Sequence, residues 1–274
     1  FADLDIDIVE LPETGGVTDF AALDTLHGSR IAAVLVQTPN VYGVVEDLRG
    51  VAEKLHGENT LLIVSSNPIS LGVLTSQGGW SADIAVGDAQ PCGLPQSFGG
   101  PSVGYIAATE RLMRKMPGRI VGQTVDADGK RAFVLTLQAR EQHIKRSRAT
   151  SNICTNQALA ALGVSVYLAT LGKRGFQMVA EQNVHKSHYL ADRIRADTSA
   201  RLAFDRPFFN EFVIDLGRNA GEVIDAFLEE GVFAGVPLAE LCGGSEHRLL
   251  VAVTEKRTRE EIDRYVELLR RVLK

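Results

Sequence analysis

Four short apolar runs constrain the fold of this chain more than any other feature. Each run is almost continuously apolar; the runs are Ile31–Val36, Leu61–Val64, Asp83–Gly87 and Val103–Ala107. Such strands, separated by helices, are typical of an α/β sheet that is covered on both faces. The connection between the last two runs leaves little room for a crossover helix, which favours an antiparallel direction for the fourth strand.

The middle of the chain predicts a hairpin followed by helices. Arg119–Val125 and Arg131–Thr136 flank the turn Asp126–Gly129, which is rich in Asp and Gly. Apolar residues at helical spacing then predict one helix over about residues 155–171, with Gly172 as its stop. A second helix is expected from about residue 175 into residue 194.

The C-terminal part has a different rhythm of strand and helix. Glu211–Asp215 and Arg248–Val253 have the pattern of strands. A helix follows each strand, and its start shows the spacing of a capping box; the two pairs are Asn219 with Glu222 and Thr258 with Glu261. These elements predict a second, small α/β domain, with its boundary along the helices between about residues 155 and 195.

Charge and hydropathy patterning exclude two classes of partner. The 274 residues carry a formal net charge of −5, whereas nucleic-acid-binding proteins normally present a basic face. No apolar run approaches the roughly 20 residues that span a bilayer. We therefore expect neither a nucleic-acid partner nor a membrane partner.

Cysteine and histidine usage indicates a reducing compartment and no metal centre. Cys92, Cys154 and Cys242 are odd in number and far apart, which argues against a disulfide framework and favours the cytoplasm. His185 and His188 lie three residues apart on an expected helix, but no third ligand lies near them in the sequence. We expect no bound metal.

One loop joins two of the expected strands at the edge where α/β sheets place their ligands. It runs from Gly87 to Pro101 and contains Gly99 and Gly100. Glycines let the backbone approach a ligand closely, and their amides are able to face an anion. A Gly/Pro-rich connection is more often a simple turn, so the pattern alone leaves both interpretations open.

A dense group of basic residues follows the hairpin. Its members are Arg140, His143, Lys145, Arg146 and Arg148. An exposed helix and loop is the simpler interpretation of this segment. The alternatives are a positive wall for a phosphate or carboxylate, or a contact with another subunit.

A polar loop follows the first apolar run. It covers Gln37–Gly43 and is followed by Glu46 and Asp47. A loop at a strand end is able to line a ligand site, but a simple entry into the next helix is the alternative.

Four motifs together resemble the P-protein of the glycine cleavage system, which is glycine dehydrogenase (decarboxylating). They are Gln37–Gly43 with Glu46–Asp47, Ser97–Pro101, Pro117–Gly122 and, most specifically, Gln138–Thr155. The likeness keeps the family order and continues more weakly to the C-terminus. The chain is similar to the N-terminal half of the one-chain form and to subunit 1 (alpha) of the two-chain form. Because it ends after one small domain, it resembles the two-chain form.

The resemblance implies a fold. This is the pyridoxal-phosphate (PLP)-dependent transferase fold of the aspartate-aminotransferase type. Residues 1–160 would be the C-terminal part of its large domain, and residues 161–274 the connecting helices and the small C-terminal α/β domain. Family members carry a long stretch before the position of Phe1, and the chain lacks an initiator Met. We therefore expect a fragment without the N-terminal part.

The resemblance also implies a cofactor and partners. PLP would be held covalently by a lysine of subunit 2, glycine would be decarboxylated, and the aminomethyl group would pass to the lipoyl group of H protein. In this chain Gln90 and Pro91 stand at about the position of that lysine, and Ser65 and Ser66 stand where an Asp would pair with the pyridine nitrogen. We expect no catalytic residue here, no activity without subunit 2, and a cytoplasmic heterotetramer.

Site residues follow from the same resemblance. By analogy with dimers of this fold type, Phe98, Gly99 and Gly100 would offer backbone amides to the phosphate of the PLP held by subunit 2. The candidates for lining the shared site or the interface are Arg140, His143 and Asn152.

Two other functions stay open. The first is a different PLP-fold aminotransferase or decarboxylase, which needs a Schiff-base lysine in this chain. Lys145 is the nearest candidate, with Arg146 and Arg148 as cations that would lower its pKa, but it does not follow a buried strand. The second is a purely structural partner subunit that contacts no active site.

Overall fold

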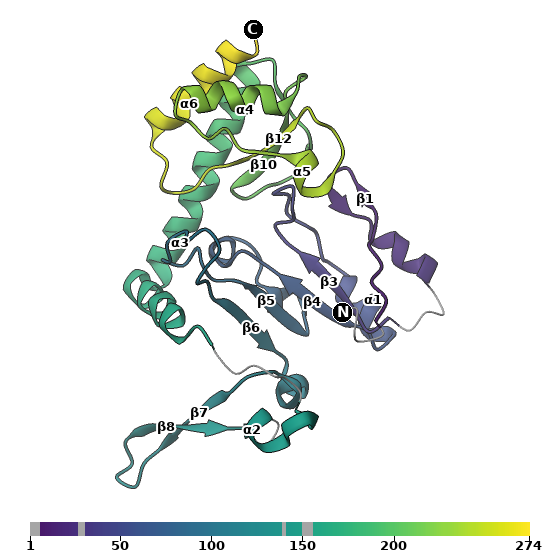
Figure 1. The fold of residues 1–274 in the computed structure, drawn as a ribbon. Helices are drawn as coiled ribbons and strands as arrows, with labels where there is room; N and C mark the ends of the chain where they lie inside the picture. The colour runs from purple at the N-terminus through teal and green to yellow at the C-terminus, as the bar shows by residue number, and fades with distance from the viewer. Residues whose placement is uncertain (1–5, 27–30, 139–140, 150–155) are drawn as a thin grey trace.

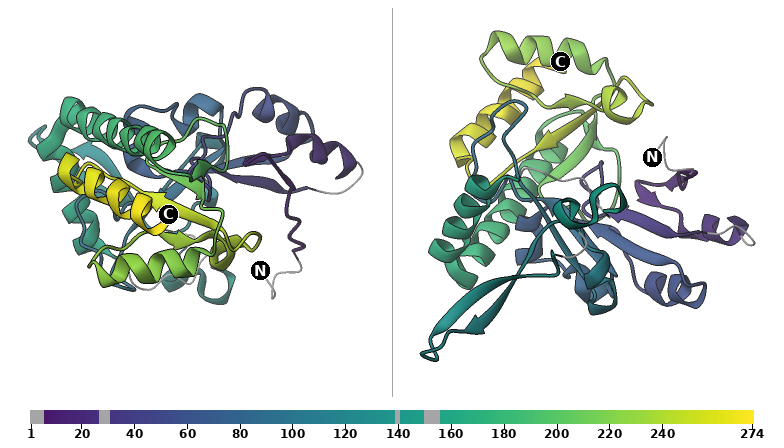
Figure 2. Two further views of the ribbon diagram at one scale, coloured as in Figure 1. Left: turned by 90° about the horizontal axis from the view of Figure 1, so that it is seen from above. Right: turned by 60° about the horizontal axis from the view of Figure 1, so that its bottom comes forward.

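The computed structural model describes residues 6–26, 31–138, 141–149 and 156–274. Its elements form two four-stranded sheets, and the long helix α3 (Ala158–Asp197) passes from the first sheet to the second (Figure 1). A two-stranded hairpin projects away from the rest (Figure 2). The α/β architecture expected from the apolar runs is confirmed.

The first sheet has the strand order β3-β4-β5-β6. Its strands are β3 (Ala33–Gln37), β4 (Leu61–Ser65), β5 (Ile84–Asp88) and β6 (Gly104–Ala108). β3, β4 and β5 are parallel, whereas β6 pairs with β5 in the antiparallel direction, as the short connection predicted. The carboxyl ends of the three parallel strands meet at one edge, and the β5–β6 loop leaves the sheet there.

One face of the first sheet carries the core. Val36 and Val64 on that face pack with helix α1 (Val51–Gly57) and the 3₁₀ helix η1 (Phe20–Leu26). Leu35 points to the other face and is 65% exposed. The expected sheet with two covered faces is therefore wrong for the described residues at β3, because α1 and η1 both pack on the same side.

Short elements fill the connections. They are β1 (Glu13–Thr14), β2 (Val17–Thr18), η2 (Pro68–Gly72), η3 (Gln77–Trp80), η4 (Glu110–Lys115), α2 (Gln142–Lys145) and η6 (Arg146–Arg148). β1 and β2 form a small antiparallel pair, and η3 lies between β4 and β5.

The predicted hairpin is confirmed as β7 (Ile120–Val125) and β8 (Arg131–Thr136). Residues directly opposite each other on paired strands share a face. One face of this hairpin carries four exposed apolar side chains, namely Val121, Val125, Phe133 and Leu135. No other sheet strand pairs with the hairpin among the described residues.

Helix α3 is broken at Gly172, whose φ of 60° and ψ of −177° are not helical. The two helices predicted on either side of this glycine are therefore confirmed, and they follow each other as one long element. Leu190 and Ile194 in the second part are fully buried in the core of the second sheet. The division of the chain into domains at residue 160 stays a prediction.

The second sheet is antiparallel, with the order β11-β12-β10-β9. Its elements are β9 (Arg201–Leu202), β10 (Glu211–Asp215), α4 (Ala220–Glu229), β11 (Val236–Pro237), α5 (Leu238–Cys242), β12 (Arg248–Ala252) and α6 (Arg259–Val272). Side chains of β10, β12, α3, α4 and α6 share one core. The predicted strand–helix pairs are confirmed.

The two predicted helix starts differ in detail. Thr258 and Glu261 form the full capping box, because each side chain accepts a hydrogen bond from the other's backbone amide. Asn219 caps α4 by accepting from Gly221 and Glu222, but the Glu222 carboxylate accepts from Arg218. The reciprocal bond predicted from Glu222 back to Asn219 is therefore replaced by an ion pair between Glu222 and Arg218.

Candidate functional site

The loop between β5 and β6 spans residues 89–103, and its first half is packed against α3. A Cβ added to Gly93, whose φ is 87°, would lie 2.7 Å from the ring of Tyr167. A Cβ added to Gly163 on α3 would lie 3.1 Å from Leu94. These two glycines let helix and loop approach closely, so the first half of the loop is a fixed part of the fold.

Cys92 lies in this fixed half and is 1% exposed. Burial raises the pKa of its thiol to about 11. Because only the thiolate is strongly nucleophilic, Cys92 is a packing residue at neutral pH.

The second half of the loop stands free. Phe98 is 99% exposed and has a φ of 49°, and it is followed by Gly99 and Gly100 with φ of 123° and 120°. No atom lies within 4 Å of a Cβ added to Gly99, so the conformation and not crowding favours glycine there. Within the described residues, none of the hydrogen bonds uses the backbone amides of these three residues. They are available to an acceptor from outside.

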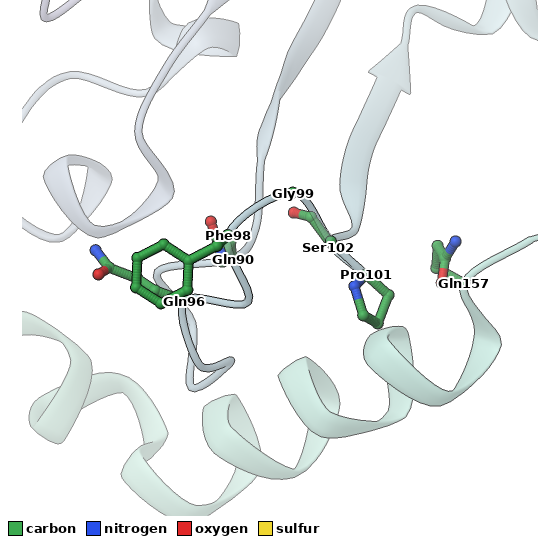
Figure 3. Close-up of a pocket in the computed structure, with 8 residues that line it drawn as sticks. Gln90, Gln96, Phe98, Gly99, Pro101, Ser102 and Gln157 are labelled. Carbon is green, nitrogen blue, oxygen red and sulfur yellow. The ribbon is translucent and has the colours of Figure 1, made fainter.

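This free half borders an open hollow of about 540 Å³. The hollow is lined by Gln90, Gln96, Phe98, Gly99, Gly100, Pro101, Ser102 and Gln157 (Figure 3). All eight residues are uncharged, and the polar groups are amides and one hydroxyl. Such a set holds an anion by hydrogen bonds from neutral donors, as backbone anion-binding nests do.

Three hydrogen bonds hold the base of the loop together. The Ala89 amide donates to the Val103 carbonyl at 2.8 Å, which extends the β5–β6 ladder by one step. The Asp88 carboxylate accepts from the Ser102 hydroxyl at 2.7 Å and from the Gln90 amide at 2.9 Å, both at Oδ1. Asp88 at the end of β5 therefore joins residues near both ends of the loop.

Gln77 and Tyr105 close the strand ends beside the loop. The Gln77 side-chain amide donates to the carbonyls of Val64 and Val86 and to the Tyr105 hydroxyl, at 2.9–3.0 Å. The Tyr105 hydroxyl donates to the Ser66 carbonyl at 2.9 Å. Burial raises the pKa of Tyr105, so this hydroxyl remains a donor at neutral pH. Ser66, at a position that the resemblance set against an acidic residue, thus meets a neutral hydroxyl donor.

The structure brings part of the predicted site together. Phe98, Gly99 and Gly100 line the hollow, as the glycine-rich loop suggested. Two lining residues, Ser102 and Gln157, lie outside the loop Gly87–Pro101 that the sequence singled out. Ser102 directly follows the Gly-Gly-Pro run, and that adjacency was the available signal for it.

The basic segment lies elsewhere. His143 is exposed on α2 and is not among the residues that line the hollow. Figure 1 shows α2 beside the β7–β8 hairpin. Lys145 is exposed too, so it lacks the burial that activates a lysine nucleophile. Arg140 and Asn152 lie outside the described residues.

The polar loop after β3 has a structural role. Glu46 is 2% exposed and accepts hydrogen bonds from the backbone and hydroxyl of Thr18 and from the side chain of Asn40. A Cβ added to Gly43 would lie 2.0 Å from the Glu211 carbonyl oxygen, so only glycine fits against the second sheet. This loop ties β2 and the second sheet to the first sheet.

The described residues offer neither a metal-binding group nor a membrane-spanning helix. They contain no group of three or more His, Cys, Asp or Glu side chains placed to hold a metal ion. No helix among them combines the length and the apolar character needed to cross a membrane.

Comparison with known sequences gives one consistent match. The model of the glycine cleavage system P-protein family matches residues 2–269. A glycine dehydrogenase (decarboxylating) subunit 1 of Geobacillus kaustophilus is 52% identical over 268 residues, covering 96% of this chain and 59% of the relative. The protein of the same name from Listeria monocytogenes is 52% identical over 264 residues with the same coverage. The chain spans about three fifths of the length of these relatives.

Solved structures agree with the sequence match. A glycine decarboxylase (P-protein) of the glycine cleavage system, solved in inhibitor-bound form, has a TM-score of 0.91 and 40% identity. The match covers 99% of this chain and 61% of that one. An alanine–glyoxylate aminotransferase from Nostoc sp. matches 95% of this chain and 67% of its own, with a TM-score of 0.63 and 19% identity, which shows the fold alone. The expected PLP-dependent aminotransferase fold is confirmed.

Proposed function

Because this chain belongs to the glycine cleavage system P-protein family, we propose that it acts as the glycine dehydrogenase (decarboxylating) subunit without the Schiff-base lysine. In this role it supports PLP-dependent glycine decarboxylation and aminomethyl transfer to the lipoyl group of H protein, in glycine catabolism. A second subunit holds PLP covalently. The name "subunit 1" of the relatives supports such a partner.

The free amides of the β5–β6 loop carry this proposal. Phe98, Gly99 and Gly100 have no acceptor among the described residues and face an open hollow lined by neutral groups. A phosphate needs several donors at once, and backbone amides next to glycines provide them without a side chain in the way. The residues present therefore fit the phosphate end of PLP.

The same residues do not fit covalent attachment of the cofactor. The Gln90 side chain donates to the Pro95 carbonyl at 3.0 Å, and Pro91 has no side-chain nitrogen to offer. Ser65 and Ser66, which stand where the resemblance would place an acidic partner for a pyridine ring, carry no carboxylate, and the Ser66 carbonyl accepts from Tyr105. These observations favour a partner subunit as the holder of the ring and of its lysine.

PLP, when bound, supplies the electron sink for decarboxylation. The task of this chain is to bind and orient: its loop amides donate to the phosphate and fix the cofactor at the subunit boundary. The fully exposed Phe98 ring next to these amides becomes covered when a partner meets the loop, which removes apolar surface and water from the same place. We propose a cytoplasmic heterotetramer that acts on glycine and H protein.

The test compares glycines in the assembled enzyme, with the chain reconstituted with its partner subunit. Gly99 and Gly100 have φ near 120°, a conformation that alanine rarely adopts. Gly99→Ala and Gly100→Ala therefore shift the backbone and move its amides. Losing one hydrogen bond to a charged group weakens PLP binding by roughly tenfold or more. The control is Gly217→Ala, because Gly217 has a positive φ of 66°, open space around it and a position between β10 and α4, outside the β5–β6 loop.

Cofactor affinity is measured by absorbance titration, and activity by glycine–bicarbonate exchange with H protein. Weakened PLP binding in both loop variants, with the control unchanged, supports the proposal. Unchanged affinity and exchange in the loop variants would instead favour the purely structural subunit. A borohydride-fixed PLP adduct on a lysine of the isolated chain would favour the different PLP enzyme.

A further inference from the structure

We propose that the hydrogen bond between Asp88 and Ser102 is a latch that positions the phosphate-binding amides of the β5–β6 loop. This inference rests on the proposed function, because it assigns to Asp88 and Ser102 a role in holding the loop amides ready for the cofactor phosphate. Both are positioning residues: the latch acts through Phe98, Gly99 and Gly100.

The two halves of the loop are held very differently. In the first half, the Cys92 amide donates to the Ala89 carbonyl at 2.9 Å and the Leu94 amide to the Gln90 carbonyl at 3.1 Å. Packing against Tyr167 adds to these bonds. In the second half, none of the hydrogen bonds within the described residues involves residues 96–101. The free segment therefore depends on what holds its two ends.

Ser102 anchors the C-terminal end of the free segment, close to the two glycines. It lies three residues after Gly99 and two after Gly100, and its hydroxyl donates to Asp88 Oδ1 at 2.7 Å. The next tie is the bond from the Ala89 amide to the Val103 carbonyl, one residue further from the glycines. Without the latch, the segment that no hydrogen bond supports becomes longer. Ordering it for phosphate binding then costs more conformational entropy, and glycines lose the most.

Asp88 is suited to this task by its place. It is the last residue of β5, paired with Gly104 at the start of β6, so the sheet fixes its backbone. The same oxygen, Oδ1, also accepts from the Gln90 amide at 2.9 Å, which fixes the direction of the carboxylate. Among the described residues no ion pair involves Asp88. Asp88 is joined to Ser102 by a hydrogen bond, and a neutral acceptor oxygen at position 88 would accept the same bond.

A matched set of variants separates the charge of Asp88 from its role as a hydrogen-bond acceptor. Asp88→Ala and Ser102→Ala remove the latch. Asp88→Asn keeps an acceptor oxygen without the charge, and Ser102→Thr keeps the hydroxyl. The double variant Asp88→Ala with Ser102→Ala tests whether the two residues act as one unit.

The experiment uses the chain assembled with its partner subunit and measures the Kd of PLP and of pyridoxal, which lacks the phosphate. Each alanine variant is expected to raise the Kd of PLP roughly three- to tenfold, because Ser102→Ala removes one hydrogen bond and Asp88→Ala removes that bond together with the one from the Gln90 backbone amide. The double variant raises it no further than the stronger single variant. Asp88→Asn and Ser102→Thr stay within about twofold of wild type, and the Kd of pyridoxal does not change in any variant.

Three results would overturn the latch. They are an unchanged PLP Kd in both alanine variants, an equal loss for pyridoxal, and a loss in Asp88→Asn as large as in Asp88→Ala. The Gly99→Ala variant, measured in parallel, separates the two proposals. If Gly99→Ala weakens PLP binding while the latch variants do not, only the latch fails; if Gly99→Ala has no effect, the proposed function fails.

Discussion

Two antiparallel strand pairs of this chain carry similar apolar side chains in opposite surroundings. In the pair β10–β12, Phe212, Ile214 and Leu249 are at most 3% exposed, because α3, α4 and α6 share a core with them. In the hairpin β7–β8, Phe133 is 63% exposed and Val125 64%. The strands differ little in apolar content, so the helices around them decide how much each side chain contributes to stability. An isolated two-stranded hairpin is only marginally stable in water.

The largest expected loss of stability lies in the core that covers β10 and β12. Phe227 on α4 is fully buried and packs with its ring centroid 5.0 Å from that of Tyr265. Phe227→Ala leaves a cavity that the surrounding helices cannot refill, and it should lower the free energy of unfolding by about 3–5 kcal/mol. Urea denaturation measures this change. A loss below about 1 kcal/mol would show that this core relaxes around the cavity.

A smaller effect is expected from a buried carboxylate at the amino end of β5. Asp83 is 3% exposed and accepts from the Leu62 amide, from Arg111 and from the His56 ring. Asp83→Ala should cost about 1–3 kcal/mol, because the buried Leu62 amide loses its partner. Urea denaturation of the variant beside wild type measures it, and an equal loss in Leu35→Ala, at an exposed position, would contradict this account.

The same carboxylate predicts a pH dependence. Burial alone would raise the pKa of Asp83, but hydrogen bonds from Leu62, Arg111 and His56 outweigh burial and hold the pKa below its usual range. The stability it contributes is therefore complete above the unfolded pKa of about 3.9 and is lost as the pH falls through the lower folded pKa. The difference in unfolding free energy between wild type and Asp83→Asn should shrink as the pH falls from about 6 to below 3.

The capping box of α6 is expected to contribute about 1 kcal/mol. α6 covers β10 and β12, and its first turn depends on the reciprocal bonds between Thr258 and Glu261. Thr258→Ala should lower the free energy of unfolding by that amount, whereas Thr258→Ser keeps the cap. Thermal unfolding of both variants distinguishes them, and equal losses would mean that the methyl group and not the hydroxyl matters.

The smallest effect is expected in the uncovered hairpin. Phe133→Ala removes as much side chain as the change at Phe227, but from a position that is already 63% exposed. The free energy of unfolding of the isolated chain should change by less than about 0.5 kcal/mol. A loss above about 1 kcal/mol would mean that the hairpin face is covered in solution, and the comparison of the two strand pairs would break.

The sequence predicted these regions with unequal success, for physical reasons. The antiparallel β6, the hairpin and the break at Gly172 follow from local patterns: loop length, turn residues and a helix stop. The covering of β3 on one face only was not predictable, because an apolar run does not say which neighbours it meets. Leu35 and Val36 look alike in the sequence, yet only Val36 is buried.

The candidate site divides in the same way. Gly99 and Gly100 are visible in the sequence, but a Gly/Pro-rich connection is more often a simple turn, so the pattern alone left both interpretations open. The contact of Asp88 with Ser102 joins residues 14 apart, and that of Gln77 with Tyr105 joins residues 28 apart. No periodicity links such pairs, so only the folded chain reveals that they meet.

Burial of Cys92 in the first half of the loop has a practical consequence for measuring motion. Cys242 is exposed, so a thiol reagent reaches it in the folded chain without any rearrangement. Cys92 reacts only while its packing with Ile69, Ala180 and Phe209 opens, because it is 1% exposed and burial raises its pKa to about 11. With Cys154 replaced by alanine, the ratio of the labelling rates of Cys92 and Cys242 measures how often the first half of the loop opens.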